Sequence, residues 1–137
     1  MLNVKRIDHI AILVEDLDEA LSFWRGILGV ELMFIEDLPE EHAKVAFLPM
    51  GESEVELIKP TTEDSGLAKY LAKHGPGLHH ICLEVEDIEK VLEGLKEQSV
   101  QLINKTPLTG SRGERYAFIH PKGAHGVLIE LYELPEE

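Results

Sequence analysis

The chain has 137 residues, a hydrophobic fraction of 44% and a formal net charge of -13. This length predicts one domain with a buried core. The acidic charge excludes non-specific binding to nucleic-acid phosphates, and no apolar run approaches the ~20 residues that cross a membrane. The one cysteine, Cys82, rules out an internal disulfide and is typical of a reducing compartment. We therefore expect a cytoplasmic protein that binds neither nucleic acid nor membrane.

An internal repeat organises the sequence. Residues 8–21 align with residues 79–92 at an offset of 71, and six of the fourteen pairs are identical, where chance would give roughly one. In both copies an alternating, β-branched segment precedes an Asp residue and an amphipathic pattern, which predicts a strand followed by a capped helix. The chain is therefore interpreted as a duplication.

The expected elements follow the repeat in chain order. In the first copy they are a strand at 6–14, a helix at 16–29 and strands at 30–36, 43–49 and 53–59. A capped connecting helix is expected at about 65–74. In the second copy they are a strand at 78–86, a helix at 87–98 and strands at 100–104, 115–120 and 126–133. The sequence thus predicts one α+β domain over residues 1–137, in which two tandem βαβββ modules, at about 5–60 and 77–133, form a cupped mixed β-sheet.

Two histidines and two glutamates recur at corresponding places. His9 and His80 lie on the strand face opposite the aliphatic residues, and Glu56 and Glu130 do the same in the last strand of each copy. A buried carboxylate without a partner is very costly. One such residue alone is more often structural, but the recurrence of both types favours a divalent-metal site. Mixed nitrogen and oxygen ligands suit Zn²⁺, Co²⁺, Ni²⁺, Mn²⁺ or Fe²⁺ without separating them.

A basic cluster is the candidate contact for an anionic ligand. Its members are close in sequence: Lys105, Arg112, Arg115 and Lys122. Phosphate contact and an ordinary solvated surface are equally good interpretations of these charges. Cys82 is expected to be a small core residue.

Four segments carry a resemblance to a known family: "IDHIAILVEDLDEAL", "VAFLPMG…VELIKP", "LAKYLAKHGPGLHHICLEVEDI" and "FIHPKGAHGVLIEL". With the duplicated modules, they resemble the vicinal oxygen chelate superfamily, which has the glyoxalase fold, and within it the methylmalonyl-CoA epimerase family, over about residues 5–133. The resemblance implies epimerisation of (2R)- and (2S)-methylmalonyl-CoA, an acyl-CoA substrate, on the route from propionyl-CoA to succinyl-CoA. It also implies His9, Glu56, His80 and Glu130 as ligands of a divalent ion, Co²⁺ in the first place, and a homodimer.

One departure concerns the proton-transfer bases. Some family members carry a glutamate where this chain has Val45, and some carry glutamine in place of Glu56. Glu41 is close in sequence, but the strand register does not obviously bring it to the site. Our hypothesis is that Glu56 and Glu130 serve the two faces of the enolate as catalytic residues. Two alternatives stay open: a metal-dependent lyase like glyoxalase I, and a non-catalytic module that binds small molecules.

Overall fold

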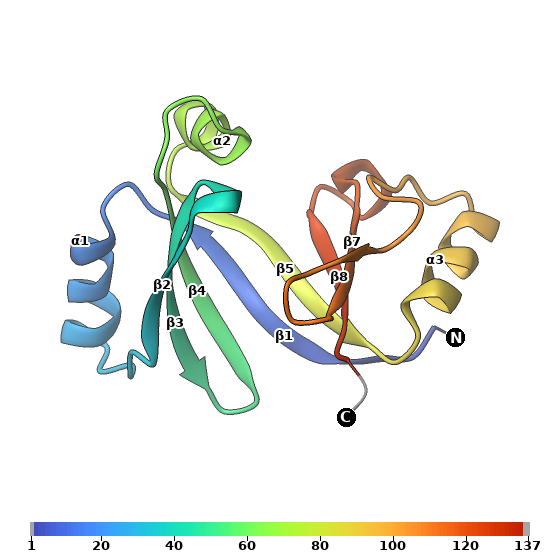
Figure 1. The fold of residues 1–137 in the computed structure, drawn as a ribbon, viewed down its shortest axis with the longest axis horizontal. Helices are drawn as coiled ribbons and strands as arrows, with labels where there is room; N and C mark the ends of the chain where they lie inside the picture. Colours follow the sequence, from blue (N-terminus) through green and yellow to red (C-terminus); the bar gives the residue numbers. More distant parts are fainter. Residues whose placement is uncertain (1, 136–137) are drawn as a thin grey trace. The chain divides into compact units, whose positions relative to one another are not determined.

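The computed structural model describes residues 2–135 and divides into two compact units. One unit is formed by Ile10–His79, and the other by the described residues on either side of that segment. The eight strands of the described chain have the order β2-β3-β4-β1-β5-β8-β7-β6, and β1 and β5 contribute residues to both units. Figure 1 shows the helices and strands along the chain. The fold is a mixed sheet with helices, as expected for the α+β class. Within the described residues, no helix is long and apolar enough to cross a membrane.

The unit Ile10–His79 contains the first helix and three complete strands. Its elements after β1 (Val4–Leu13) are α1 (Leu17–Leu21), a π-helical segment (Ser22–Ile27), β2 (Phe34–Leu38), a 3-10 turn (Pro39–Glu41), β3 (Ala43–Met50), β4 (Ser53–Pro60) and α2 (Gly66–His74). Strands β2, β3 and β4 pair antiparallel in sequence order. One core cluster packs Val14, Leu48 and Leu57 near residues of α1, and a second packs Leu13 and Val45 against α2.

The other unit contains the beginning of β1 and the second half of the chain. Its elements are β5 (Gly77–Val85), α3 (Ile88–Glu97), β6 (Leu108–Thr109), β7 (Arg115–Ile119), a 3-10 turn (Pro121–Gly123) and β8 (Ile129–Glu133). Strand β8 pairs parallel with β5 and antiparallel with β7. The core cluster of this unit joins Val85 and Leu131 to Ile88, Val91 and Leu92 of α3. The helix therefore covers the aliphatic face that the alternation predicted.

The helix starts agree with the sequence. The Asp16 carboxylate accepts from the Glu19 backbone nitrogen, and the Asp87 carboxylate accepts from that of Lys90. Ser65 caps α2 in the same way. These side chains satisfy backbone donors that the first helical turn leaves open, which is why both repeats turn from strand to helix at an aspartate.

One predicted strand is absent from the structure, and the predicted starts of two others were wrong. The segment 100–104 is no strand, because it pairs only through a bridge between Leu102 and Ile119. Strand β2 begins at Phe34 rather than at residue 30, since the Val30 nitrogen closes the preceding helical segment by donating to the Trp24 carbonyl. Strand β8 begins at Ile129 rather than at residue 126, because the preceding residues form a turn in which Gly126 has a φ of 95°.

Candidate metal centre

Three of the four expected ligands come together within one unit. His9 Nε2 lies 3.3 Å from His80 Nε2. The Oε1 atom of Glu130 lies 3.1 Å from His80 Nε2 and 3.4 Å from His9 Nε2. Two imidazole nitrogens and one carboxylate oxygen therefore face a common point, and the three residues form a candidate metal-binding group.

Strand register explains how β5 and β8 supply their ligands. The two strands are parallel, with Cys82 opposite Glu130 and Leu83 opposite Leu131. Leu131 is buried in the core under α3, so alternation turns Glu130 to the other face. On that face the ring of Phe118 meets the His80 ring edge-on at 5.6 Å between centroids. The imidazoles are held in a largely buried place, with His9 only 7% and His80 only 8% exposed.

The donor separations fit one bound ion. An ion with bonds of ~2.0–2.1 Å and donor-ion-donor angles of ~90–110° places its donor atoms roughly 2.9–3.4 Å apart. The three observed separations run from 3.1 to 3.4 Å. The residues present thus fit a divalent transition-metal ion.

Glu130 is the charged member of the group. Burial raises the pKa of its carboxyl, but the neighbouring His80 and His9 side chains together lower it by more, and the resulting pKa is about 2. Glu130 is therefore a carboxylate at neutral pH. An anionic oxygen between two imidazole nitrogens is a suitable donor set for a hard to borderline divalent cation.

Sequence reasoning missed Asp8. The Asp8 Oδ2 atom lies 2.8 Å from His9 Nδ1, the ring nitrogen that faces away from His80 and Glu130. A carboxylate beside the outer nitrogen of a metal-binding histidine is a common support in metal sites. The available signal was the position of Asp8 immediately before His9 in "RIDHI".

The other carboxylate candidates belong to the unit Ile10–His79. Glu56 lies on β4 between Val55 and Leu57, whose side chains are buried in the α1 core, so it is on the opposite strand face. Its assignment as a fourth ligand stays a prediction from the repeat. Val45 is 3% exposed and belongs to the core under α2. Glu41 is exposed in a 3-10 turn.

Only two of the four residues of the predicted basic cluster line the same hollow. Lys105 and Arg115 line one hollow of about 350 Å³ beside α3. Neither Arg112, in a turn, nor Lys122, in a 3-10 segment, is among the residues that line it. Arg115 already contacts two carboxylates, those of Glu89 at 2.6 Å and Glu133 at 4.0 Å. Phosphate binding by these four residues stays a prediction.

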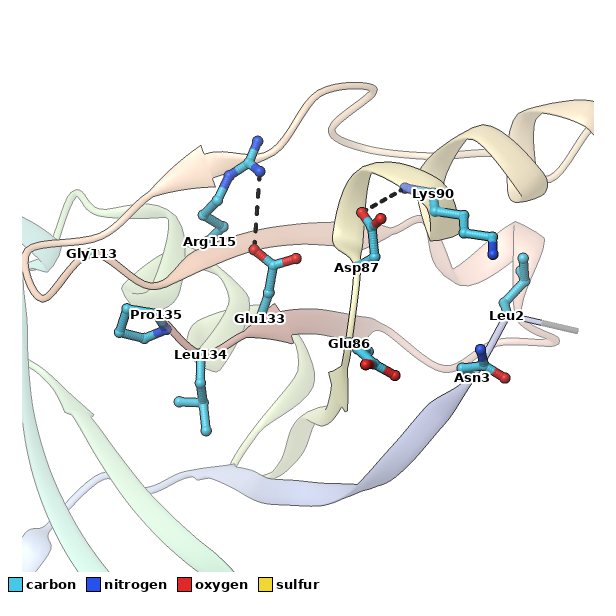
Figure 2. A pocket seen from close by; sticks show the side chains of 10 residues that line it. All are labelled: Leu2, Asn3, Glu86, Asp87, Lys90, Gly113, Arg115, Glu133, Leu134 and Pro135. Carbon is cyan, nitrogen blue, oxygen red and sulfur yellow. Dashed lines mark hydrogen bonds and ion pairs between the residues drawn. The ribbon is translucent and has the colours of Figure 1, made fainter. Parts of the chain in front are cut away.

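A larger hollow lies at the start of α3, away from the donor group. It has a volume of about 770 Å³ and is bordered by Arg115 and Lys90 together with the carboxylates of Glu86, Asp87 and Glu133 (Figure 2). None of the three metal-donor residues lines it. Some of the charged side chains that border this hollow form ion pairs with each other, such as Arg115 with Glu133.

Comparisons with known proteins find similar sequences over most of the chain. Residues 8–118 match the Glyoxalase/Bleomycin resistance protein/Dioxygenase superfamily. The chain is 40% identical over 130 residues to the uncharacterised protein YqjC of Bacillus subtilis, covering 95% of this chain and 93% of that protein. It is 37% identical over 130 residues to human mitochondrial methylmalonyl-CoA epimerase, covering 94% and 74%.

A solved structure supports the same assignment. A methylmalonyl-CoA epimerase in complex with methylmalonyl-CoA and NH4+ superposes with a TM-score of 0.84 at 37% identity, covering 96% of this chain and 95% of that one. Fold and sequence identity over nearly the full length of this chain therefore point to one group of proteins. The chain belongs to the methylmalonyl-CoA epimerase family of the glyoxalase/bleomycin resistance protein/dioxygenase superfamily.

Proposed function

We propose that this protein interconverts (2R)- and (2S)-methylmalonyl-CoA by removing and returning the α-proton at a metal-assisted site. The convergence of His9, His80 and Glu130 carries the proposal. The human relative is named for this reaction, and the solved relative holds methylmalonyl-CoA. These two relatives support the proposed reaction by similarity, and the converging His9, His80 and Glu130 side chains support it from this chain's own structure.

The residues have separate tasks in the proposed reaction. His9, His80 and Glu130 would hold the ion, with Glu56 as the fourth ligand predicted from the repeat. When bound, a divalent ion supplies Lewis-acid stabilisation of the negative charge that develops on the substrate oxygens as the α-proton leaves. Epimerisation also requires a proton acceptor and donor on each face of the planar enolate. We assign these roles to Glu130 and Glu56, the carboxylates at corresponding places in the two copies.

Deuterium uptake at C2 of methylmalonyl-CoA in D2O is the direct test. We expect rapid exchange with added Co²⁺ and loss of exchange with a chelator. His80→Asn should abolish the exchange, because it removes one of three converging nitrogen and oxygen donors. His125→Asn is the matched control, since His125 is exposed in a turn with a φ of 56° that asparagine tolerates. Folded, metal-loaded protein that exchanges no deuterium would contradict the proposed reaction.

A second pair of variants tests the proposed bases. Glu56→Gln keeps an oxygen donor but loses the basic carboxylate, so metal binding should persist while most proton exchange is lost. Glu93→Gln, on the exposed side of α3, is the control for removal of one negative charge. Full activity of Glu56→Gln would show that the second base lies elsewhere in the chain.

The rival functions predict different outcomes in the same experiments. A lyase of the glyoxalase I type would convert the methylglyoxal-glutathione adduct and leave methylmalonyl-CoA unchanged. A non-catalytic binding module would carry no metal after purification. Co²⁺ as the native ion, a homodimer, a cytoplasmic location and a place in propionate metabolism are further parts of the proposal. Metal analysis of the purified protein and its mass in solution test the first two.

A further inference from the structure

The two ring nitrogens of His9 face different partners. Nε2 faces His80 and Glu130, whereas Nδ1 lies 2.8 Å from the Asp8 carboxylate. An ionised carboxylate only accepts hydrogen bonds, so the Nδ1-H group donates to Asp8. This bond fixes the ring plane and directs the Nε2 atom toward the donor group.

Asp8 is itself held in place by a chain of ion pairs. Its Oδ1 atom accepts from the Nη2 group of Arg6 at 3.0 Å, and the Nε-H of Arg6 donates to Glu84 at 2.8 Å. The second oxygen of Glu84 lies 3.5 Å from Lys5 Nζ. One guanidinium group thus joins two carboxylates, and its rigid planar shape limits how far either can turn.

Glu84 makes this arrangement more than a surface ion pair. The residue is only 7% exposed, and a buried carboxylate is stable only when charged or polar partners replace its water. Arg6 is therefore bound on one side to a buried carboxylate. Its other end transmits that restraint to Asp8.

The second copy has other residue types at the corresponding positions. At the offset of 71, Arg6 corresponds to Gly77 and Asp8 corresponds to His79. The second copy therefore has neither the guanidinium nor the carboxylate at these places. His79 instead packs its ring edge-on against Tyr70, with 4.8 Å between centroids.

We propose that Asp8, held by Arg6 and Glu84, is a positioning residue that orients His9 and sets the metal affinity of the site. The inference rests on the metal centre proposed above and concerns metal binding rather than the reaction. Loss of such a supporting carboxylate typically weakens metal binding by about 10–100-fold. Asp8 touches His9 and is assigned no contact with substrate.

The test is the Co²⁺ affinity of the full chain, measured by competition with a chromophoric chelator. We expect Asp8→Ala to bind Co²⁺ about 10–100-fold more weakly than the wild type. Glu93→Ala is the control, because it removes the same charge from an exposed position on α3, and it should match the wild type. Equal affinities for Asp8→Ala and wild type, or an equal loss in Glu93→Ala, would overturn the proposal.

Two further variants keep the test decisive if Asp8→Ala does not fold. Asp8→Asn retains an acceptor oxygen without the charge, and Arg6→Gln removes the bridge to Glu84. Each should weaken Co²⁺ binding by less than Asp8→Ala would and change the visible absorption of bound Co²⁺. Wild-type affinity and an unchanged spectrum in both variants would overturn the proposal.

The outcomes also separate this inference from the proposed reaction. A wild type that binds no Co²⁺ overturns both the metal centre and the role of Asp8. A wild type that binds Co²⁺ but exchanges no deuterium contradicts the epimerase reaction alone. In that case, weaker binding by Asp8→Ala still supports the positioning role.

Discussion

Removal of the metal should lower the thermal stability of the protein by a predictable amount. The donor atoms of His9, His80 and Glu130 already lie 3.1 to 3.4 Å apart in the folded chain, whereas the unfolded chain holds no such group. A ligand that binds only the folded state at 100 times its Kd stabilises that state by about 2.7 kcal/mol. For a chain of 137 residues, the unfolding entropy is about 0.29 kcal/mol/K, so the Tm should rise by about 9 °C.

Scanning calorimetry with and without a chelator measures this shift. The free Co²⁺ concentration is set to 100 times the Kd from the competition titration, so no other parameter is adjusted. His80→Asn at the same free Co²⁺ concentration should show a much smaller shift, because one nitrogen donor is lost. A wild-type Tm that does not respond to Co²⁺, or an equal response in His80→Asn, would refute the assignment of these residues as ligands.

Three further predictions concern the scaffold of the site. Leu131→Ala removes a side chain that is 1% exposed in the core under α3. It should lower the free energy of unfolding, measured in urea titrations, by about 2–5 kcal/mol. The control Leu134→Ala changes a residue that is 45% exposed and should alter this free energy by less than about 0.5 kcal/mol. Asp87→Ala removes the cap of α3 and should cost about 1 kcal/mol in the same titration, whereas a value near zero would contradict the capping role. Cys82 is fully buried, and burial raises the pKa of its thiol to about 12. Iodoacetamide at pH 8 should therefore modify this thiol only after the protein unfolds. Rapid modification of the folded protein would contradict the burial of Cys82.

The repeat made much of the fold predictable. Alternation alone separated the faces of β5 and β8, so Leu131 is in the core and Glu130 is on the face with His80, as the sequence indicated. The helix caps Asp16 and Asp87 could be predicted from the sequence because each forms a hydrogen bond with a backbone nitrogen only three residues away. Local geometry and hydrophobic periodicity are properties that a single sequence carries directly.

Two of the features that the sequence did not predict depend on contacts between residues far apart in the chain. The segment around Leu102 has strand-like composition, but its pairing is limited to one bridge with Ile119. The partners of Arg115 come from α3 and β8, and sequence spacing does not reveal such pairs. Asp8 was missed because simple alternation directs neighbouring strand residues to opposite faces, which gives no reason to expect its carboxylate 2.8 Å from the His9 ring.

The identities that the two copies share have physical roles that can be separated. His9 and His80 are retained as the converging nitrogen donors, and Asp16 and Asp87 as helix caps. The pair Val14 and Val85, like Leu21 and Leu92, packs in the core cluster of its own half of the chain. Asp8 and its counterpart His79 have different contacts: Asp8 lies beside the His9 ring, and His79 packs against Tyr70. The duplication therefore predicts one histidine donor from each copy, whereas a carboxylate directly before the histidine occurs only in the first copy, at Asp8.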